Sequence, residues 1–417
     1  MSSDLVVHGA EWTVKELFVY PNEFIYWSIQ IVMYPYMTGL VAGAFVLSSL
    51  YHVFGQKDLK EIAQFSLVFS LALLPVAAVP LLLHLQQPTR AIEPLLTPHF
   101  TSAIAAFGIV FTTYALIVLS EIWFVYRAYF VAQVHALRDQ PGLRNRMRLL
   151  VYRGLTIGAY DVSKEALATD HKAAKVLAGV GIPVACFLHG YAGFIFGSVK
   201  ANALWMSPLM PVIFIMSAVV SGIALCMLTY IVIMEWQAFR TRRRGAGMQS
   251  SEIRGAEKDI IDKSARYLLG FLVAAISLEI LDLIFRGYTA MKSWDILRSV
   301  MYGHDFVKIF ILQYMLGNLV PFILLLLPGR TIKRTVVALL LVLFGVFMMR
   351  WNVVIGGQAF SLSFSGYMHY EIPIIPHSLE TFKEGLFGAL TVIALPFIFF
   401  WVINKFVPSL RRDIEVG

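Results

Sequence analysis

Nine long apolar runs dominate this chain and limit the folds open to it. Each run holds about 20 residues and is bounded by charge, which is the length that an α-helix needs to cross a bilayer. Hydrophobic residues make up 58% of the 417 residues and charged residues 14%, too little polar surface for a soluble protein of this size. The sequence therefore predicts an all-α, polytopic transmembrane bundle of about nine helices, within a range of eight to ten, near residues 25–54, 62–85, 101–126, 174–197, 208–236, 266–286, 307–328, 335–356 and 385–404.

The distribution of Lys and Arg predicts how this bundle is oriented. Most basic residues follow the odd-numbered helices, and few follow the even-numbered ones. By the positive-inside rule, the N-terminus lies outside and the C-terminus inside. The whole chain, 1–417, then forms a single integral membrane domain with two cytoplasmic loops, 127–173 and 237–265. We expect basic clusters beside membrane helices to meet anionic lipid rather than nucleic acid.

Several kinds of chemistry have no support in the sequence. The two cysteines, Cys186 and Cys226, lie inside apolar runs, so neither a disulfide scaffold nor a cysteine-ligated metal cluster is expected. We find no P-loop, no GxGxxG before a helix, no CxxC and no HExxH, which leaves phosphate, dinucleotide and zinc chemistry without a motif. We predict no metal site, and any iron–sulfur centre would belong to a partner subunit.

One imidazole, His189, lies deep inside the apolar run 174–197. An ionisable side chain in hydrocarbon costs about 3 kcal/mol on insertion scales, so it is expected to face protein or water. A helix-packing histidine bonded to a carbonyl group is the alternative to a functional one. Glycines beside it, and the pair Gly39 and Gly43 spaced as GxxxG in the first helix, allow close approach of a neighbouring helix or a flat ligand.

Other ionisable residues are predicted at the same depth as His189. Glu279 and Asp282 share one face of the sixth helix, because residues three apart are neighbours on a helix. Arg350 in the eighth helix is a candidate to neutralise one of these acids, since a buried pair costs less than separate charges. His84, Arg90 and His99 flank the short link between the second and third helices, where ordinary interfacial histidines are the alternative.

Titratable groups that converge at one depth suit a quinone. A quinone needs hydrogen-bond partners at its two carbonyl groups and a proton relay to water, and histidine and carboxylate supply both. Glu121 and Glu235 are predicted near the inner side, where they are either solvated interface carboxylates or the continuation of a proton path. Proton transfer across the membrane is left open by the sequence.

Four stretches carry a resemblance to a known family: HLQQPTR, TPHFTSAIAAFG, IPVACFLHGYAGFIFG and RWNVVIGGQ. In their order and spacing, the chain resembles the NrfD/PsrC (polysulfide reductase membrane subunit) family, especially its longer HybB, DsrP, QrcD and Act-like branch. The resemblance extends from the first helix to the ninth. The family's D-L-G-x-P-x-R pattern appears as HLQQPTR, with His84 at the position of the acid.

The resemblance implies a quinone-binding membrane subunit of a respiratory oxidoreductase in a bacterial or archaeal cytoplasmic membrane. Such a subunit binds menaquinone or ubiquinone as a substrate, without haem or an iron–sulfur cluster of its own. The implied partners are a periplasmic ferredoxin-like iron–sulfur subunit and molybdopterin-type or multihaem cytochrome c subunits. The residues implied for the reaction are His189, His99, Glu279, Asp282 and Arg350, and those implied for the quinone pocket are His84, Arg90, Gln30 and Tyr34.

Three other functions are weighed against this one. A di-haem cytochrome b anchor requires facing histidines within helices, and only His189 is deep in a helix. A secondary transporter requires inverted repeats with broken helices, and no convincing repeat is found. A purely structural anchor has no use for buried acids, and it predicts that Glu279→Gln leaves quinone turnover unchanged.

Overall fold

The computed structural model describes residues 6–7, 10–11, 25–99, 101–200, 202–243, 250–288, 292–360 and 367–410. Within these residues, nine helices are long and apolar enough to cross a membrane, which confirms the predicted number. The chain is a multi-pass membrane protein with an all-α fold. The orientation, N-terminus outside and C-terminus inside, stays a prediction, and residues 1–5 and 411–417 lie outside the described residues.

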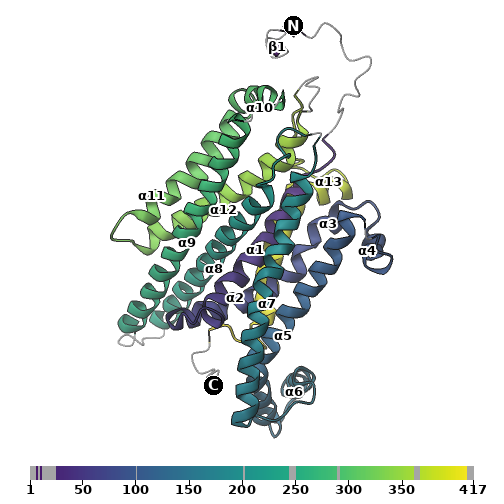
Figure 1. The fold of residues 1–417 in the computed structure, drawn as a ribbon. Helices are drawn as coiled ribbons and strands as arrows, with labels where there is room; N and C mark the ends of the chain where they lie inside the picture. The colour runs from purple at the N-terminus through teal and green to yellow at the C-terminus, as the bar shows by residue number, and fades with distance from the viewer. Residues whose placement is uncertain are drawn as a thin grey trace.

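The nine spans are either single long helices or two helical pieces in series (Figure 1). The single helices are α1 (Ile29–His52), α5 (Ala103–Leu137), α7 (Lys164–Gly197), α8 (Met210–Arg243), α9 (Ser250–Tyr288) and α14 (Leu386–Ile403). The paired pieces are α2 (Lys60–Ala77) with α3 (Val79–His84), η4 (Val307–Leu319) with α11 (Val320–Leu326), and α12 (Ile332–Trp351) with η5 (Asn352–Gly356). Both η4 and η5 are π-helices, a rare winding that is frequent at functional sites.

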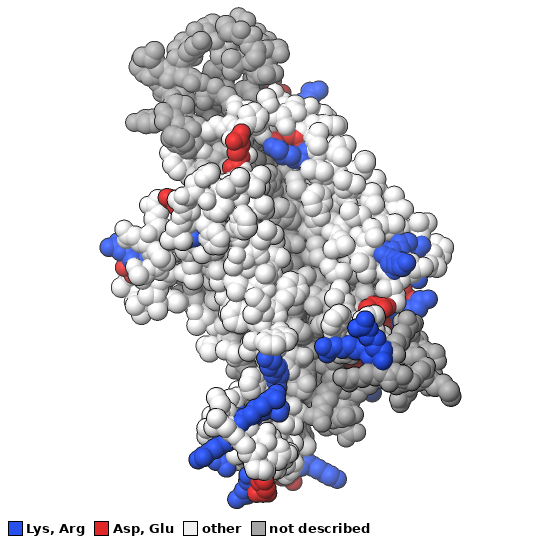
Figure 2. Space-filling model, turned by 180° about the vertical axis from the view of Figure 1, so that it is seen from behind, with Lys and Arg blue, Asp and Glu red and all other residues white. Residues whose placement is uncertain are grey.

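Short elements lie at the two ends of the bundle (Figure 1). One end, called the α13 end, carries η3 (Pro88–Ile92), α4 (Glu93–Leu96), α10 (Lys292–Tyr302) and α13 (Leu379–Glu384). The opposite end, called the α6 end, carries η2 (Lys57–Leu59) and α6 (Leu143–Thr156). Two short strands, β1 (Val6–Val7) and β2 (Ala10–Glu11), pair antiparallel. On the face shown in Figure 2, charged side chains gather toward the ends and an uncharged belt lies between them, as a bilayer requires.

The segments 127–173 and 237–265, predicted as loops, are largely helical in their described parts. α5 continues to Leu137 and α7 already begins at Lys164, beyond the predicted ends of these spans. The prediction ended the third helix where charge begins, but Arg127 is buried and pairs with Asp170 of α7, 2.6 Å between Nη2 and Oδ2. A paired charge can be buried between helices, so both helices continue past it. The cytoplasmic location of these segments stays a prediction.

α1 lies at the centre of the bundle. Of its most apolar window, 94% is buried, and the helix packs against α2, α7, α8, α12 and α14. The close approach predicted from the GxxxG spacing is confirmed, because the backbone of Gly43 meets that of Gly222 in α8. Gly39 leaves room for the ring of His189, whose Cε1 lies 3.0 Å from where a Cβ would be. Small residues thus fix α1 against its neighbours and open the space in which His189 lies.

Candidate functional site

Glu279 is a buried carboxylate in the wall of a pocket between α9 and η4. Its side chain comes from an apolar stretch of α9 and is 8% exposed. Gln313 Nε2 and Asn318 Nδ2, both from η4, donate hydrogen bonds to Glu279 Oε2 at 3.1 and 3.0 Å. Two donors on one oxygen lower the cost of keeping a carboxylate in a span.

The π-helical winding of η4 explains why both amides reach the same oxygen. A π-helix forms hydrogen bonds from residue i to residue i+5, so residues five apart lie above one another on the same face. Gln313 and Asn318 are five apart and both point to Glu279. The network extends to η5, because Asn352 Nδ2 donates to Gln313 Oε1 at 2.8 Å. Both π-helices therefore contribute side chains to one polar cluster.

Asp282 lies one turn along α9 and is held by a different set of partners. Arg286 Nε lies 2.8 Å from Asp282 Oδ2, and the hydroxyl of Ser207 donates to Asp282 Oδ1. Arg286 also donates to the carbonyl oxygens of Ala203 and Leu204, at 2.6 and 3.0 Å. Of the two acids that Arg350 was predicted to neutralise, Glu279 or Asp282, it is therefore not the partner of Asp282. Arg286, four residues along the same helix, forms that pair, as i,i+4 charges commonly do.

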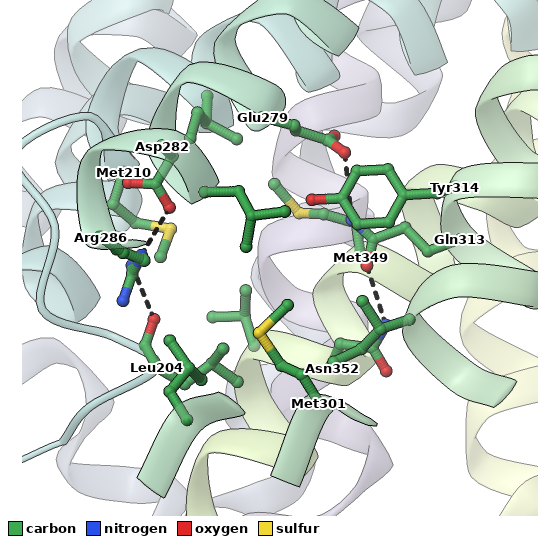
Figure 3. Close-up of a pocket in the computed structure, with 15 residues that line it drawn as sticks. Leu204, Met210, Glu279, Asp282, Arg286, Met301, Gln313, Tyr314, Met349 and Asn352 are labelled. Carbon is green, nitrogen blue, oxygen red and sulfur yellow. Dashed lines mark hydrogen bonds and ion pairs between the residues drawn. The ribbon is translucent and has the colours of Figure 1, made fainter. Parts of the chain in front are cut away.

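Glu279 and Asp282 line the same pocket (Figure 3). Because Leu297 and Met301 of α10 also line it, the pocket lies toward the α13 end. Its cavity volume is about 80 Å³. Figure 3 shows Glu279, Gln313 and Tyr314 on one side and Asp282 and Arg286 on the other, with methionine side chains between them. A pocket with mostly apolar walls and a few converging polar groups is typical of a small-molecule site.

An apolar crevice adjoins this pocket on the outer surface of the bundle. It runs between α9 and η4, has a volume of about 540 Å³, and is lined mainly by aliphatic and aromatic side chains such as Ile280, Leu319 and Phe322. Ile280 and Leu319 are 45% and 51% exposed, on a face that lipid would cover. Tyr314 lines both the crevice and the pocket, and Asn318 lines the crevice while bonding Glu279. The crevice is therefore separated from the polar pocket by single side chains.

His189 and Arg350 form a second buried cluster, at the crossing of α1, α7, α8 and α12. Arg350, which is 0% exposed, donates to His189 Nε2 at 2.9 Å and to Ser217 Oγ at 2.7 Å. Its guanidinium carbon lies 3.7 Å from the centre of the Phe214 ring, a cation–π contact. Because arginine has no acceptor, Nε2 of His189 accepts, and the ring proton is on Nδ1, which faces Thr38 Oγ1 at 3.5 Å.

His189 was predicted to lie with Glu279 and Asp282 at one site, but it contacts Arg350 instead. His189 and Arg350 lie outside the lining of the pocket in Figure 3, although the charge of Arg350 interacts with that of Glu279. Met349, the neighbour of Arg350, does line the pocket. His189 therefore positions Arg350 behind the pocket wall, and its predicted contact with a ligand stays a prediction.

A third group, at the α13 end, joins residues from opposite ends of the sequence. His84 Nδ1 lies 3.0 Å from Glu384 Oε2, and the hydroxyl of Ser28 also donates to this oxygen. Gln30 Nε2 donates to the carbonyl oxygen of Lys383 at 2.5 Å. Burial alone would raise the pKa of Glu384, but the hydrogen bonds from His84 and Ser28 outweigh it and lower the pKa below 4.5. The predicted pocket residues His84 and Gln30 thus anchor α13.

Glu384→Gln is expected to lower the stability of the folded chain at neutral pH by less than about 1 kcal/mol, because the contact between His84 and Glu384 is partly exposed. A carboxylate whose pKa is lowered on folding stabilises the fold above its unfolded pKa, and this stabilisation is lost as the pH falls through the folded pKa. The thermal midpoints of the wild type and the variant should therefore differ at neutral pH and converge well below pH 4.5. A difference that persists in acid would contradict this account of Glu384.

The remaining predicted residues lie apart from these clusters. His99 is exposed in the link before α5 and shares a hydrogen bond with Thr101, 2.8 Å from Nδ1. Arg90 is 67% exposed at its side chain and lies 3.7 Å from Glu93. Tyr34 is buried in α1 against Phe107, with ring centres 5.4 Å apart. The structure thus brings together Glu279 with Asp282, His189 with Arg350, and His84 with Gln30, in three groups rather than one.

Sequence reasoning missed the amides that hold Glu279. Gln313, Asn318 and Asn352 are 6%, 7% and 5% exposed, inside apolar spans where an unpaired amide is costly. The signal in the sequence is three polar residues in two apolar runs. A five-residue spacing places side chains on different faces of an ordinary α-helix, so the sequence does not place Gln313 and Asn318 together.

The nine spans, with acids and bases buried around a pocket near one end, define a multi-pass membrane protein whose helices carry ionisable groups toward its interior. Such groups inside a membrane are costly and usually functional. The chain belongs to the polysulphide reductase NrfD family, whose model matches residues 20–362. The predicted family is thereby confirmed, as is the multi-pass membrane location.

Two relatives are similar to this chain over different lengths. A selenate reductase subunit of Mesobacillus selenatarsenatis is 32% identical over 204 residues, which cover 49% of this chain and 47% of the relative. The chain thus matches about half the length of that protein. A putative dimethyl sulfoxide reductase membrane subunit of Halobacterium salinarum is 26% identical over 355 residues, 84% of this chain and 71% of the relative. Both names describe subunits of reductases.

Proposed function

We propose that this chain is the quinone-reactive membrane subunit of a respiratory oxidoreductase complex. Electrons pass between menaquinone or ubiquinone and an iron–sulfur partner subunit, in either direction. The observation that carries the proposal is Glu279, a buried carboxylate held by two amides in a pocket that adjoins an apolar crevice. Membership of the NrfD family, and relatives named as reductase subunits, support the same class.

The pocket supplies the groups that quinone chemistry needs. A quinone takes up two electrons and two protons on becoming a quinol, so its site needs groups that exchange protons. Glu279 Oε2 accepts both amide hydrogen bonds, which leaves Oε1 as the atom to exchange a proton with a headgroup. Tyr314, whose hydroxyl points into the pocket in Figure 3, is a candidate hydrogen-bond partner for a carbonyl group. Asp282, neutralised by Arg286, is the second carboxylate in reach of the pocket.

Arg350 and His189 act on this chemistry from behind the pocket wall. The positive charge of Arg350 interacts with the carboxylate of Glu279. His189 and Ser217 hold the guanidinium in place through hydrogen bonds of 2.9 and 2.7 Å. His189 and Ser217 thus position the charge of Arg350, and Glu279 exchanges the proton with the quinone.

The crevice between α9 and η4 suits the apolar tail of a quinone. It faces the lipid side and its walls are almost entirely hydrocarbon, whereas the adjoining pocket is polar. A molecule with an isoprenoid chain and a polar ring would fit an apolar crevice that adjoins a polar pocket. Entry from the membrane also avoids passage of the tail through water, which costs about 0.8 kcal/mol per CH₂ group.

The partners follow from the position of the pocket. It lies toward the α13 end, so a ferredoxin-like iron–sulfur subunit is proposed to dock there, with molybdopterin-type or multihaem cytochrome c subunits beyond it. By the predicted orientation this is the periplasmic side. His99 and Arg90, exposed at this end, are then available to such a partner or to the aqueous proton pool.

The alternatives have less support. A di-haem anchor requires facing histidines, yet among the described residues the two buried histidines, His52 and His189, face Glu121 and Arg350. A secondary transporter is not favoured by the two relatives, whose names describe reductase subunits. A purely structural anchor would not need the hydrogen-bond network around Glu279.

Leu319→Trp tests the proposed function through the crevice. A larger side chain there would fill part of the space for the tail and should weaken quinone binding about tenfold, the equivalent of about two buried CH₂ groups. Binding is measured by labelling of the full chain in lipid nanodiscs with a photoreactive quinone, competed by unlabelled quinone. The wild type should be labelled in peptides of α9 and η4.

Leu340→Trp is the matched control. Leu340 of α12 is also 51% exposed, but it lies outside the crevice lining. Its substitution should leave labelling unchanged. Equal labelling of the two variants, or labels confined to peptides around His84 and Gln30, would contradict binding of the headgroup in the Glu279 pocket.

A further inference from the structure

A second pair of buried titratable side chains lies away from the pocket in Figure 3. Glu121 of α5 has 0% side-chain exposure, and His52, the last residue of α1, has 2%. His52 Nδ1 lies 3.7 Å from Glu121 Oε1. At 1.5 Å per residue, Glu121 lies about 27 Å along α5 from Ala103 at the α13 end. The pair therefore lies in the half of the bundle toward the α6 end.

These two side chains lack the partners that buried polar groups normally have. Neither Glu121 oxygen, nor Nε2 of His52, has a hydrogen-bond partner among the described residues. Ser48 Oγ, 3.4 Å from His52 Nδ1, shares a hydrogen bond with the pair. A carboxylate without partners in a membrane span has a high free energy. The pair therefore has its lowest free energy when it holds one proton, on Glu121 or on His52. Such a pair is unlike Glu279 and Asp282, whose hydrogen bonds stabilise their charge.

Titratable groups face the pair from three helices. His171 of α7 interacts electrostatically with His52 and is itself exposed. Tyr51 of α1 packs edge-on against the His52 ring at 5.0 Å, and Tyr114 of α5 interacts with Glu121. The nearby charges of Arg127 and Asp170 neutralise each other at 2.6 Å. His171 is thus an exposed titratable side chain whose charge acts on the buried pair.

We propose that His52 and Glu121 form a proton-exchange site that is loaded through His171 from the aqueous face at the α6 end. A proton from His171 is taken by the open Nε2 of His52, and the proton on Nδ1 passes to Glu121 Oε1. A small rotation of the ring closes the 3.7 Å separation. One proton enters and one proton is held, so no other reactant is needed.

The site complements the quinone pocket but does not depend on it. If quinone chemistry takes place at Glu279, the chain exchanges protons at two depths, one near each end. That consequence rests on the proposed function, whereas protonation of Glu121 does not. Glu235, the other acid predicted on this side, is exposed on α8 and does not join the pair.

Infrared difference spectra of the full chain in lipid nanodiscs test the proposal directly. A protonated buried carboxyl group gives a carbonyl band that should change with pH in the wild type. Glu121→Gln should remove this band, whereas the control Glu93→Gln, with 58% side-chain exposure, should retain it. His52→Gln should change its pH dependence, and His171→Gln should slow its response to a pH jump several-fold. An unchanged band in Glu121→Gln would overturn the proposal.

A measurement on the wild type keeps the test independent of folding in the variants. Dicyclohexylcarbodiimide dissolves in hydrocarbon and adds to protonated carboxyl groups, so peptide mass spectrometry should find its adduct on Glu121 and not on Glu93. Labelling of Glu121 should fall as the pH rises. Labelling that is independent of pH, together with an unchanged infrared band, would refute proton exchange there. Both readouts are free of quinone, so they remain valid if the proposed function fails.

Discussion

Glu279→Gln is expected to lower quinone-dependent electron transfer at least about 100-fold, the typical contribution of a positioned proton donor or acceptor. Glutamine has nearly the same shape, and its carbonyl oxygen can still accept from Gln313 and Asn318, so the local fold should persist. What is lost is the proton that the carboxyl group exchanges. The measurement is turnover of the intact complex with menaquinol or ubiquinol analogues, together with the affinity for the quinone.

The kinetic pattern separates a chemical role of Glu279 from a binding role. A group that exchanges a proton in the reaction should affect kcat, while KM changes little. Glu93→Gln, an exposed carboxylate near the same end, is the control and should retain full turnover. Normal turnover of Glu279→Gln would exclude this carboxylate as the proton-exchanging group. His84 and Glu384 would then be the next candidates for that role.

Gly222→Ala is expected to destabilise the fold by about 3 kcal/mol. A Cβ on Gly222 would overlap the backbone of Gly43 and Ala44 in α1. Backbone atoms cannot turn away as a side chain does, so α1 and α8 would be forced apart along the central crossing of the bundle. The expected result is a large loss of monodisperse protein in size-exclusion chromatography and a lower thermal midpoint.

Gly270→Ala is the control with the opposite expectation. Gly270 lies in α9, and a Cβ there would meet no atom within 4 Å. Alanine favours a helix over glycine by up to about 1 kcal/mol, so this variant should be as stable as the wild type or slightly more stable. Equal losses in both variants would show that helix propensity, and not the contact between α1 and α8, controls the outcome.

The spans themselves could be predicted from the sequence because one strong physical requirement governs them. A segment in hydrocarbon has to satisfy its own backbone hydrogen bonds, so apolar length alone indicates a helix. The cost of a charged side chain in hydrocarbon indicated that Glu279 and Asp282 face protein or water. The ends of the spans were less predictable, since a charge such as Arg127 ends a helix only if no partner such as Asp170 is near it.

The partners of the buried groups could not be predicted with the same certainty. His84 and Glu384 are 300 residues apart, and their contact depends on how α13 is placed against α3. The π-helical winding of η4 is a consequence of packing, and without it Gln313 and Asn318 would not share a face. The pair of Asp282 and Arg286 has an i,i+4 spacing, but Arg286 is the last residue of the predicted sixth helix, 266–286, where an interfacial charge is expected.

The central place of α1 has a consequence for how the chain is made. Of the nine described spans, α1 precedes the other eight, yet its surface carries Gln30, Thr38, Ser48 and His52, which lipid solvates poorly. The helices that finally enclose it include α8, α12 and α14, and α14 follows the other described spans in the chain. Nascent chains therefore hold a partly polar helix without its final neighbours until α14 has been synthesised. Truncation before α14 should leave this helix open to membrane quality-control proteases.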